Sequence, residues 1–172
     1  EVYARIVDGV IAAAQAGDAI YAVPGHPLVG EATVPPLLKR ARELGIAEYV
    51  EFRPVTRDVP AALADIDIFV LPSRTEGLSN SLMEAMACGC AVVASAVGGN
   101  LELVRPEVTG LLFPAGNVGE LRNQMARLLE APQECERLAS AGAEWIRTNF
   151  SLEPAARRLE QLYSQSLIYS QR

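Results

Sequence analysis

Two acidic side chains flank a short polar turn, and they are the residues of this sequence best suited to chemistry. Glu76 precedes the turn and Glu84 follows it, and between them Gly77, Ser79 and Asn80 lead into a predicted helix over residues 81–88. Free N–H groups at the start of a helix, together with the helix dipole, bind phosphate and other anions. Carboxylates accept hydrogen bonds from hydroxyl groups such as those of sugars. The pattern therefore predicts a site for a phosphosugar or a nucleotide sugar.

A purely structural interpretation of the same residues is also open. Ser81 and Glu84 have the S-x-x-E spacing of a capping box. In that motif the serine and the glutamate close the N-terminus of the helix, and no ligand is needed. Spacing alone favours the capping box over the ligand site.

The elements that would position this turn alternate along the chain. Short apolar runs predict five strands, at residues 19–23, 49–52, 66–71, 91–94 and 110–113. Helical patterns precede and separate them, at residues 2–14, 33–45, 58–64, 81–88 and 99–105. After the fifth strand, helices begin near Asn117 (with Glu120 as a capping box), at Pro132 and after Ser151. This alternation predicts an α/β fold, a doubly wound parallel sheet with helices on both faces and extra C-terminal helices.

Ligands of such sheets bind outside the carboxyl ends of the strands. The loops at residues 24–30, 53–59, 72–80 and 95–100 follow predicted strands and are therefore the places to expect a site. The turn between Glu76 and Glu84 falls in the third of these loops.

Composition narrows the classes of partner. The chain has 172 residues, 50% of them apolar, which predicts a single domain. Its net charge of −6 argues against a nucleic-acid partner, and no apolar run is long enough to span a membrane. Cys88, Cys90 and Cys135 form no paired spacing, and Cys135 is remote from the other two in sequence. We therefore predict a reducing compartment and no metal site.

The sequence blocks around the two glutamates resemble a known family. Glu76 and Glu84 are the ends of an E-x7-E motif, and matching blocks are FVLPS at 69–73, EAMACG at 84–89, AVVAS at 91–95, VGGNLE at 97–102 and VTGLLF at 108–113. In this order they resemble the donor-binding C-terminal domain of family-four GT-B retaining glycosyltransferases. The resemblance covers residues 46–166.

The resemblance implies a role for each residue of the turn. Glu76 would contact hydroxyls of the donor sugar near the reacting centre, and Glu84 would hold the ribose of the nucleotide. The backbone N–H groups of Leu78, Ser79 and Asn80 would reach the sugar and the diphosphate. The implied ligand is a UDP- or GDP-linked sugar, and no further cofactor is required. The implied location is the cytoplasm.

Two neighbouring loops would complete the site. By the same resemblance, Arg53 and Val55 would lie beside the base, and Gly98 and Gly99 would let their loop approach the ligand closely. The family also carries an Arg–Lys pair after an earlier strand, where the cations stabilise the departing diphosphate. That pair and the acceptor-binding half have no counterpart in this sequence, so we expect no sugar transfer by this chain alone.

Residues 1–45 resemble a different family. The run YAVPGHPLVGE at 21–31 resembles a β-α segment of the tetrapyrrole (corrin/porphyrin) methylases, near their S-adenosylmethionine site. We therefore expect an engineered chimera, methylase-like over residues 1–45 and glycosyltransferase-like over residues 46–172, folded as one Rossmann-like domain over residues 1–172. Removing the first strand from the GT-B sheet leaves five strands in the flavodoxin-like order 2-1-3-4-5.

Two other functions remain open. The chain could be a natural glycosyltransferase fragment that works with a separate acceptor-binding half, or a remnant of an S-adenosylmethionine-dependent methylase. The last predicted helix carries Leu159, Leu162, Tyr163 and Leu167. This apolar stripe would either fold back on the sheet or pair two copies as a homodimer.

Overall fold

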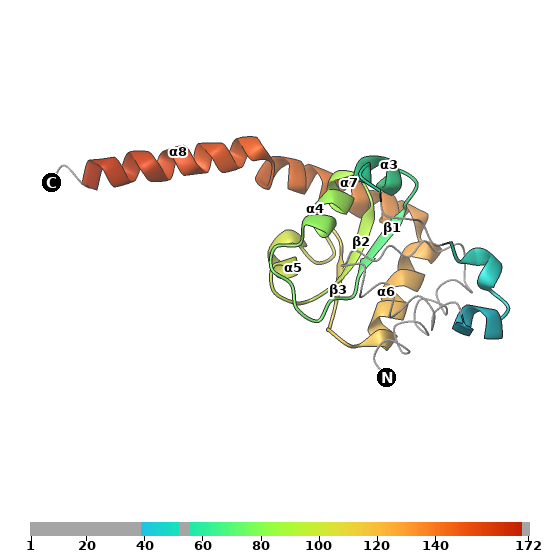
Figure 1. The fold of residues 1–172 in the computed structure, drawn as a ribbon. Coiled ribbons are helices and arrows are strands. Elements are labelled where there is room, and N and C mark those ends of the chain that lie inside the picture. Colours follow the sequence, from blue (N-terminus) through green and yellow to red (C-terminus); the bar gives the residue numbers. More distant parts are fainter. Residues whose placement is uncertain (1–38, 52–55, 170–172) are drawn as a thin grey trace.

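The computed structural model describes residues 39–51 and 56–169. At its centre is a parallel sheet of three strands, β1 (Ile68–Leu71), β2 (Ala91–Ser95) and β3 (Leu111–Phe113), arranged side by side in chain order (Figure 1). Ile68 lies opposite Ala91, and Val93 lies opposite Leu111. Every residue of β2 is buried, as expected for a strand with neighbours on both sides and helices on both faces.

Helices connect and follow the strands. They are the 3-10 helix η1 (Ala47–Tyr49) and the α-helices α3 (Val59–Leu63), α4 (Asn80–Ala87), α5 (Asn100–Leu103), α6 (Val118–Glu130), α7 (Pro132–Asn149) and α8 (Leu152–Tyr169). Residues 39–43 are also helical, and Gly45 ends that helix with a positive φ of 71°. Gly89, with φ 85°, follows α4 in the same way, and in both cases the N–H of the next residue reaches back to a carbonyl of the last turn.

The sheet separates two apolar layers. Phe69 and Leu71 of β1 point to one face, where they pack with Leu82 and Met86 of α4. The intervening Val70 points to the other face. There the layer also contains Val93, Leu111, Phe113 and the α6 residues Leu121, Met125 and Leu128. Successive residues of a strand point to opposite faces of the sheet. Both faces of this sheet are therefore apolar, and helices cover both.

Helix α7 packs against both layers. Leu138 and Ala139 near its start belong to the α6 layer, whereas Ile146 near its end belongs to the α4 layer. At Gly142 the helix passes the residues that precede β3, and a β-carbon there would stand 2.9 Å from the carbonyl oxygen of Thr109. Cys135 of the same helix approaches the carbonyl of Asp67, just before β1, so α7 passes the amino ends of β1 and β3.

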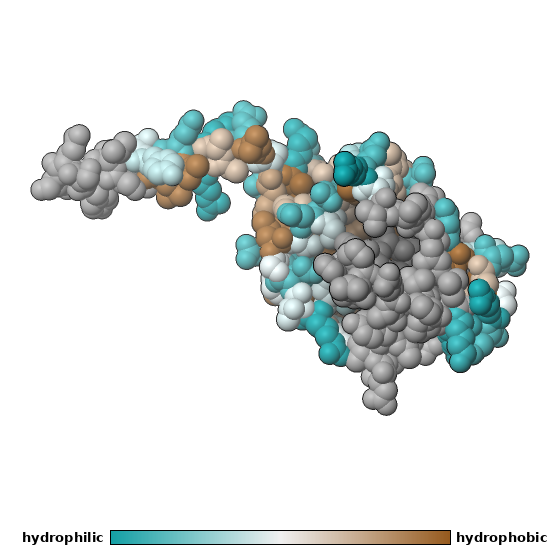
Figure 2. Space-filling model, viewed as in Figure 1, coloured by the Kyte–Doolittle hydropathy of each residue, from teal (hydrophilic) through white to brown (hydrophobic). Residues whose placement is uncertain are grey.

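Helix α8 extends away from the sheet (Figure 1). Its described side chains include four large, exposed apolar residues, Leu152, Leu159, Leu162 and Tyr163. Figure 2 shows apolar and polar surface alternating along this projecting helix. Helices of the described region lack the combination of length and apolar character that crossing a bilayer demands.

The structure confirms part of the predicted sheet. Three of the five predicted strands are present, with shifts of one or two residues at their ends. They lie next to one another in the sheet in the order predicted for the last three strands. The predicted strand at 49–52 is wrong over its described part, because Tyr49 closes η1 and residues 50 and 51 are in no strand. The predicted strand at 19–23 lies outside the described residues. A five-stranded sheet in the order 2-1-3-4-5 is therefore not established.

Candidate functional site

The carboxyl ends of β1 and β2 are followed by two loops, residues 72–79 and 96–99, that meet beside the sheet. The N–H of Gly99 donates to the carbonyl of Gly77 at 3.1 Å and also approaches the carbonyl of Glu76 at 3.4 Å. Both predicted loops, at 72–80 and 95–100, thus come together as the parallel arrangement requires. The predicted site residues of the first loop and the two glycines of the second share one edge of the fold.

Ser79, and not Ser81, caps helix α4. The backbone of Ser79 is extended, and its hydroxyl oxygen accepts from the N–H of Leu82 at 3.3 Å. Its carbonyl accepts from the N–H of Met83 at 3.1 Å. Ser81 lies within the helix, so the predicted capping box of Ser81 and Glu84 is wrong. A capping box therefore does not explain the position of Glu84.

The first turn of α4 keeps unused hydrogen-bond donors. In the described part of the chain, the backbone N–H groups of Leu78, Ser79 and Asn80 donate to no other group. Leu78 and Asn80 are exposed and Ser79 is buried. Three adjacent free donors at the positive end of an eight-residue helix are an arrangement suited to hydrogen bonding with an anion.

Glu76 is held in place on the loop before α4. Its side chain is half-buried, and its Oε1 accepts a hydrogen bond from the hydroxyl of Ser73 at 2.5 Å. Its Oε2 accepts no hydrogen bond from the described residues. Glu84, by contrast, is exposed on α4 and has no hydrogen bond or ion pair with any described group. The two carboxylates therefore differ in how firmly they are held.

Gly98 and Gly99 allow the second loop to pack on the first. Gly98 has a positive φ of 45°, and a β-carbon there would overlap the carbonyl oxygen of Glu76. A β-carbon at Gly99 would overlap the carbonyl of Gly77 and stand 2.9 Å from the α-carbon of Leu78. Both glycines therefore pack against the backbone of residues 76–78 in the first loop.

Two buried polar side chains form hydrogen bonds next to the contact between the two loops. The Ser95 hydroxyl donates to the carbonyl of Leu71 at 3.3 Å and joins the ends of β2 and β1. The Asn100 amide donates to the carbonyl of Ser95 at 3.0 Å and so holds the loop that carries the glycines. Both side chains are fully buried. The sequence analysis did not single out Ser73, Ser95 or Asn100. Small polar residues at the ends of the two apolar runs were the available signal for Ser73 and Ser95, and Asn100 at the start of the next helix had no comparable signal.

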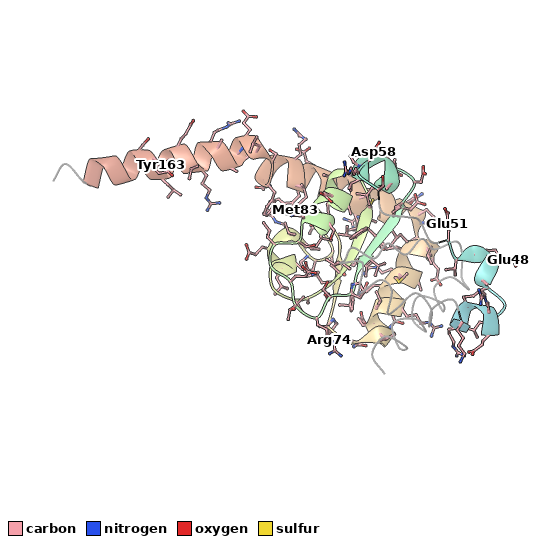
Figure 3. All side chains as sticks on the ribbon, viewed as in Figure 1. Glu48, Glu51, Asp58, Arg74, Met83 and Tyr163 are labelled. Atoms are coloured by element: carbon pink, nitrogen blue, oxygen red, sulfur yellow. The ribbon has the colours of Figure 1, made fainter. Side chains whose placement is uncertain are left out.

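Charged and sulfur-bearing groups add little to this edge. Arg74, on the first loop, is exposed and lies at the margin of the molecule (Figure 3).

Burial raises the pKa of the Cys90 thiol to about 11, with nearby Cys88, Asp67 and Cys135 adding to the effect. Cys135, which sequence alone placed far away, therefore lies near Cys90, and burial raises the pKa of its thiol too. Both thiols stay protonated at neutral pH.

No metal centre is found within the described ranges, since no three His, Cys, Asp or Glu side chains gather there in a way that could hold an ion. Arg53 and Val55, predicted to lie beside the base, fall outside the described residues.

A family model matches most of the chain. The model described as "Glycosyl transferases group 1" matches residues 15–131. This match includes both loops of the edge described above and all three strands.

Named relatives are about one third identical to this chain over the part that aligns with it. A GDP-mannose-dependent alpha-(1-6)-phosphatidylinositol monomannoside mannosyltransferase of Mycolicibacterium smegmatis is 34% identical over 137 residues, which is 74% of this chain and 36% of the relative. A D-inositol 3-phosphate glycosyltransferase of Thermomonospora curvata is 34% identical over 148 residues, 84% of this chain and 34% of the relative. The chain thus spans about a third of the length of these proteins.

Solved structures agree with the fold. HepE of Anabaena in complex with UDP superposes with a TM-score of 0.81 and 26% identity, covering 94% of this chain and 44% of HepE. Sucrose-phosphate synthase of Thermosynechococcus elongatus superposes with a TM-score of 0.74 and 29% identity, covering 96% of this chain and 43% of the synthase.

These matches do not support the predicted junction between a methylase-like and a glycosyltransferase-like segment at residue 45. The family model begins at residue 15, inside the segment predicted to be methylase-like, and each of the two solved structures alone covers 94% or 96% of this chain. The methylase resemblance and the chimeric origin stay predictions without support, and the alternative of a glycosyltransferase fragment fits better. The sheet, the paired loops, the family model and the relatives agree: the chain belongs to the group 1 glycosyl transferases.

Proposed function

We propose that this chain binds a nucleotide sugar at the carboxyl ends of β1 and β2. The observation that carries the proposal is the group of free N–H donors at Leu78, Ser79 and Asn80, which lies between two carboxylates. A diphosphate would accept hydrogen bonds from these donors, and the α4 dipole would favour its negative charge.

The carboxylates would recognise the two neutral parts of the ligand. Glu76, with its free Oε2, would accept hydrogen bonds from the donor sugar, and the exposed Glu84 would accept them from the ribose. Arg53 and Val55 would lie beside the base. Support for a nucleotide comes from HepE, whose structures are described with UDP and with UDP and glucose. The mannosyltransferase of M. smegmatis is described as GDP-mannose-dependent, so a guanine base is an equal candidate.

The reaction we propose is transfer of the sugar with retention of its anomeric configuration. The bond between the anomeric carbon and the diphosphate oxygen breaks, and the nucleoside diphosphate leaves with the electron pair. The acceptor hydroxyl oxygen forms the new bond to the anomeric carbon, and its proton passes to the departing diphosphate. We propose that this chain supplies donor binding and that transfer requires a separate acceptor-binding half.

Calorimetric titration with UDP, GDP, UDP-glucose and GDP-mannose tests donor binding. We expect submillimolar binding of one nucleotide series, weakened about tenfold by Glu84→Ala, because a hydrogen bond from a ribose hydroxyl to a charged group is lost. Glu136→Ala, an exposed glutamate on α7, is the matched control and should bind as the wild type does. Absence of heat with all four nucleotides, from a chain that unfolds cooperatively, would contradict the proposal.

Transfer is tested separately. A sugar-transfer assay with the chain alone and with candidate acceptor-binding halves should show activity only in the combined samples. Transfer by the chain alone would refute the need for a second half.

A further inference from the structure

Glu76 is fixed from two sides, and the two contacts come from different parts of the chain. Its carboxylate accepts from the Ser73 hydroxyl at 2.5 Å. Its backbone carbonyl lies against Gly98, where no β-carbon would fit. A glutamate on a loop normally samples several rotamers, and holding it in one of them costs side-chain entropy. Here the hydrogen bond to Ser73 and the packing against Gly98 favour one of them.

Ser73 itself stands on a rigid support. It lies two residues after Leu71, the last residue of β1, which is 3% exposed. The carbonyl of Leu71 accepts from the hydroxyl of Ser95 on the neighbouring strand. The hydroxyl of Ser73 is therefore held near the end of the sheet, and in the described region its hydrogen bond goes to Glu76.

We propose that Ser73 is a positioning residue, which orients the Glu76 carboxylate so that Oε2 faces the sugar of the donor. The inference rests on the proposed function, in which Glu76 recognises the sugar and the α4 N-terminus recognises the diphosphate. Ser73 uses its single hydroxyl proton on Oε1, and in the described region Oε2 keeps both lone pairs for ligand hydroxyls. Because Ser73 acts through Glu76, it should increase the affinity for the sugar part of the ligand and leave the affinity for the nucleotide part unchanged.

The test measures what the sugar adds to binding. The full chain is titrated with UDP and UDP-glucose and with GDP and GDP-mannose, and the ratio of the two dissociation constants in each pair gives the sugar's share. In Ser73→Ala we expect this ratio to fall about fivefold to tenfold, as for one hydrogen bond to a charged group. The dissociation constants of UDP and GDP themselves should not change. Ser73→Thr keeps the hydroxyl and should restore the ratio.

Ser140→Ala removes an exposed hydroxyl from α7 and is the control for handling and folding. Equal melting temperatures of the variants would establish that the fold is intact. An unchanged ratio in Ser73→Ala, or an equal loss for diphosphate and nucleotide sugar, overturns the positioning role and leaves the proposed function standing. A wild-type chain that gains nothing from the sugar also overturns the positioning role. A wild-type chain that binds no nucleotide overturns both.

Discussion

The backbone of Gly98 lies directly against the carbonyl of Glu76, closer than any residue with a β-carbon could lie. Beside this contact, the N–H of Gly99 donates to the carbonyl of Gly77 at 3.1 Å. The loops that follow β1 and β2 are therefore joined through their main chains. Any candidate ligand at this edge meets the two loops as one surface.

A methyl group at Gly99 should separate the loops. We expect Gly99→Ala to lower the free energy of unfolding by about 2 kcal/mol or more, because the added carbon would overlap a backbone carbonyl that cannot move independently. Urea unfolding followed by circular dichroism measures the change. Gly77→Ala is the matched control, since a β-carbon there would meet open space, and it should stay within about 0.5 kcal/mol. Equal stability of the two variants would refute the packing.

The cap of α4 provides a second test. Ser79→Ala should destabilise the chain by about 1 kcal/mol, because the N–H of Leu82 loses its acceptor. Ser79→Asp keeps a capping oxygen and should recover most of this loss. Ser81→Ala should cost less than about 0.5 kcal/mol, as for a residue inside the helix. The reverse order of the two alanine variants would restore the capping box that the sequence suggests.

Arg127 connects three segments through two glutamates, and this makes stability depend on pH. Its guanidinium donates to Glu107 before β3 at 2.6 and 3.0 Å and to Glu134 of α7 at 2.5 and 3.0 Å. These hydrogen bonds lower the pKa of both carboxyls. A carboxyl with a lowered pKa in the folded state stabilises the fold above its unfolded pKa, about 4.3 for glutamate, and this stabilisation disappears as the pH falls through the lowered value.

In Arg127→Ala the dependence of unfolding free energy on pH below about 4.3 should therefore become flatter. Urea titrations at a series of acidic pH values provide the measurement. Arg147→Ala is the comparison, because in the described part of the chain Arg147 pairs with Glu144 of the same helix, and this pair joins no separate segments. Identical slopes in wild type and Arg127→Ala would disprove the link.

Helix α8 should contribute little to the stability of the sheet. Leu159 and Leu162 are 52% and 57% exposed, and Tyr163 lies on the projecting part of the helix (Figure 3). Replacing both leucines by glutamate should change the free energy of unfolding by less than about 0.5 kcal/mol. A larger loss in urea unfolding would mean that the stripe is covered. Sedimentation equilibrium of the same variant tests the predicted homodimer, which requires an apolar stripe.

Strands and long helices followed from the sequence where several residues agreed. The runs that form β1, β2 and β3 are short, apolar and bounded by turn residues, and the predicted start of α7 at Pro132 is confirmed. Asn117 accepts from the N–H of Glu120 as the predicted cap of α6, although the Glu120 carboxylate bonds to Gln124 instead of returning to the cap. Tyr49 and Val50 favour strands by type, yet η1 ends there, because propensity over so few residues is weak.

The fine structure of the site depended on geometry that spacing does not contain. Ser79 and Ser81 are both good caps by type, and only the extended backbone of Ser79 selects one of them. The hydrogen bond from Ser73 to Glu76 requires the loop to curve back over three residues, which no pattern of apolar residues specifies. The glycine pair was predicted to let its loop approach the ligand, and that stays a prediction; the structure shows that both glycines approach the backbone of the loop after β1, which sequence alone could not show.

The position of α7 has a consequence for how the chain unfolds. One helix supplies Leu138 to the layer under α6 and Ile146 to the layer under α4, and Gly142 between them fits against the residues before β3. Neither layer can open while α7 stays in place, and releasing α7 exposes both at once. The two sides of the sheet should therefore exchange their amide hydrogens as one cooperative unit, with α8 exchanging earlier.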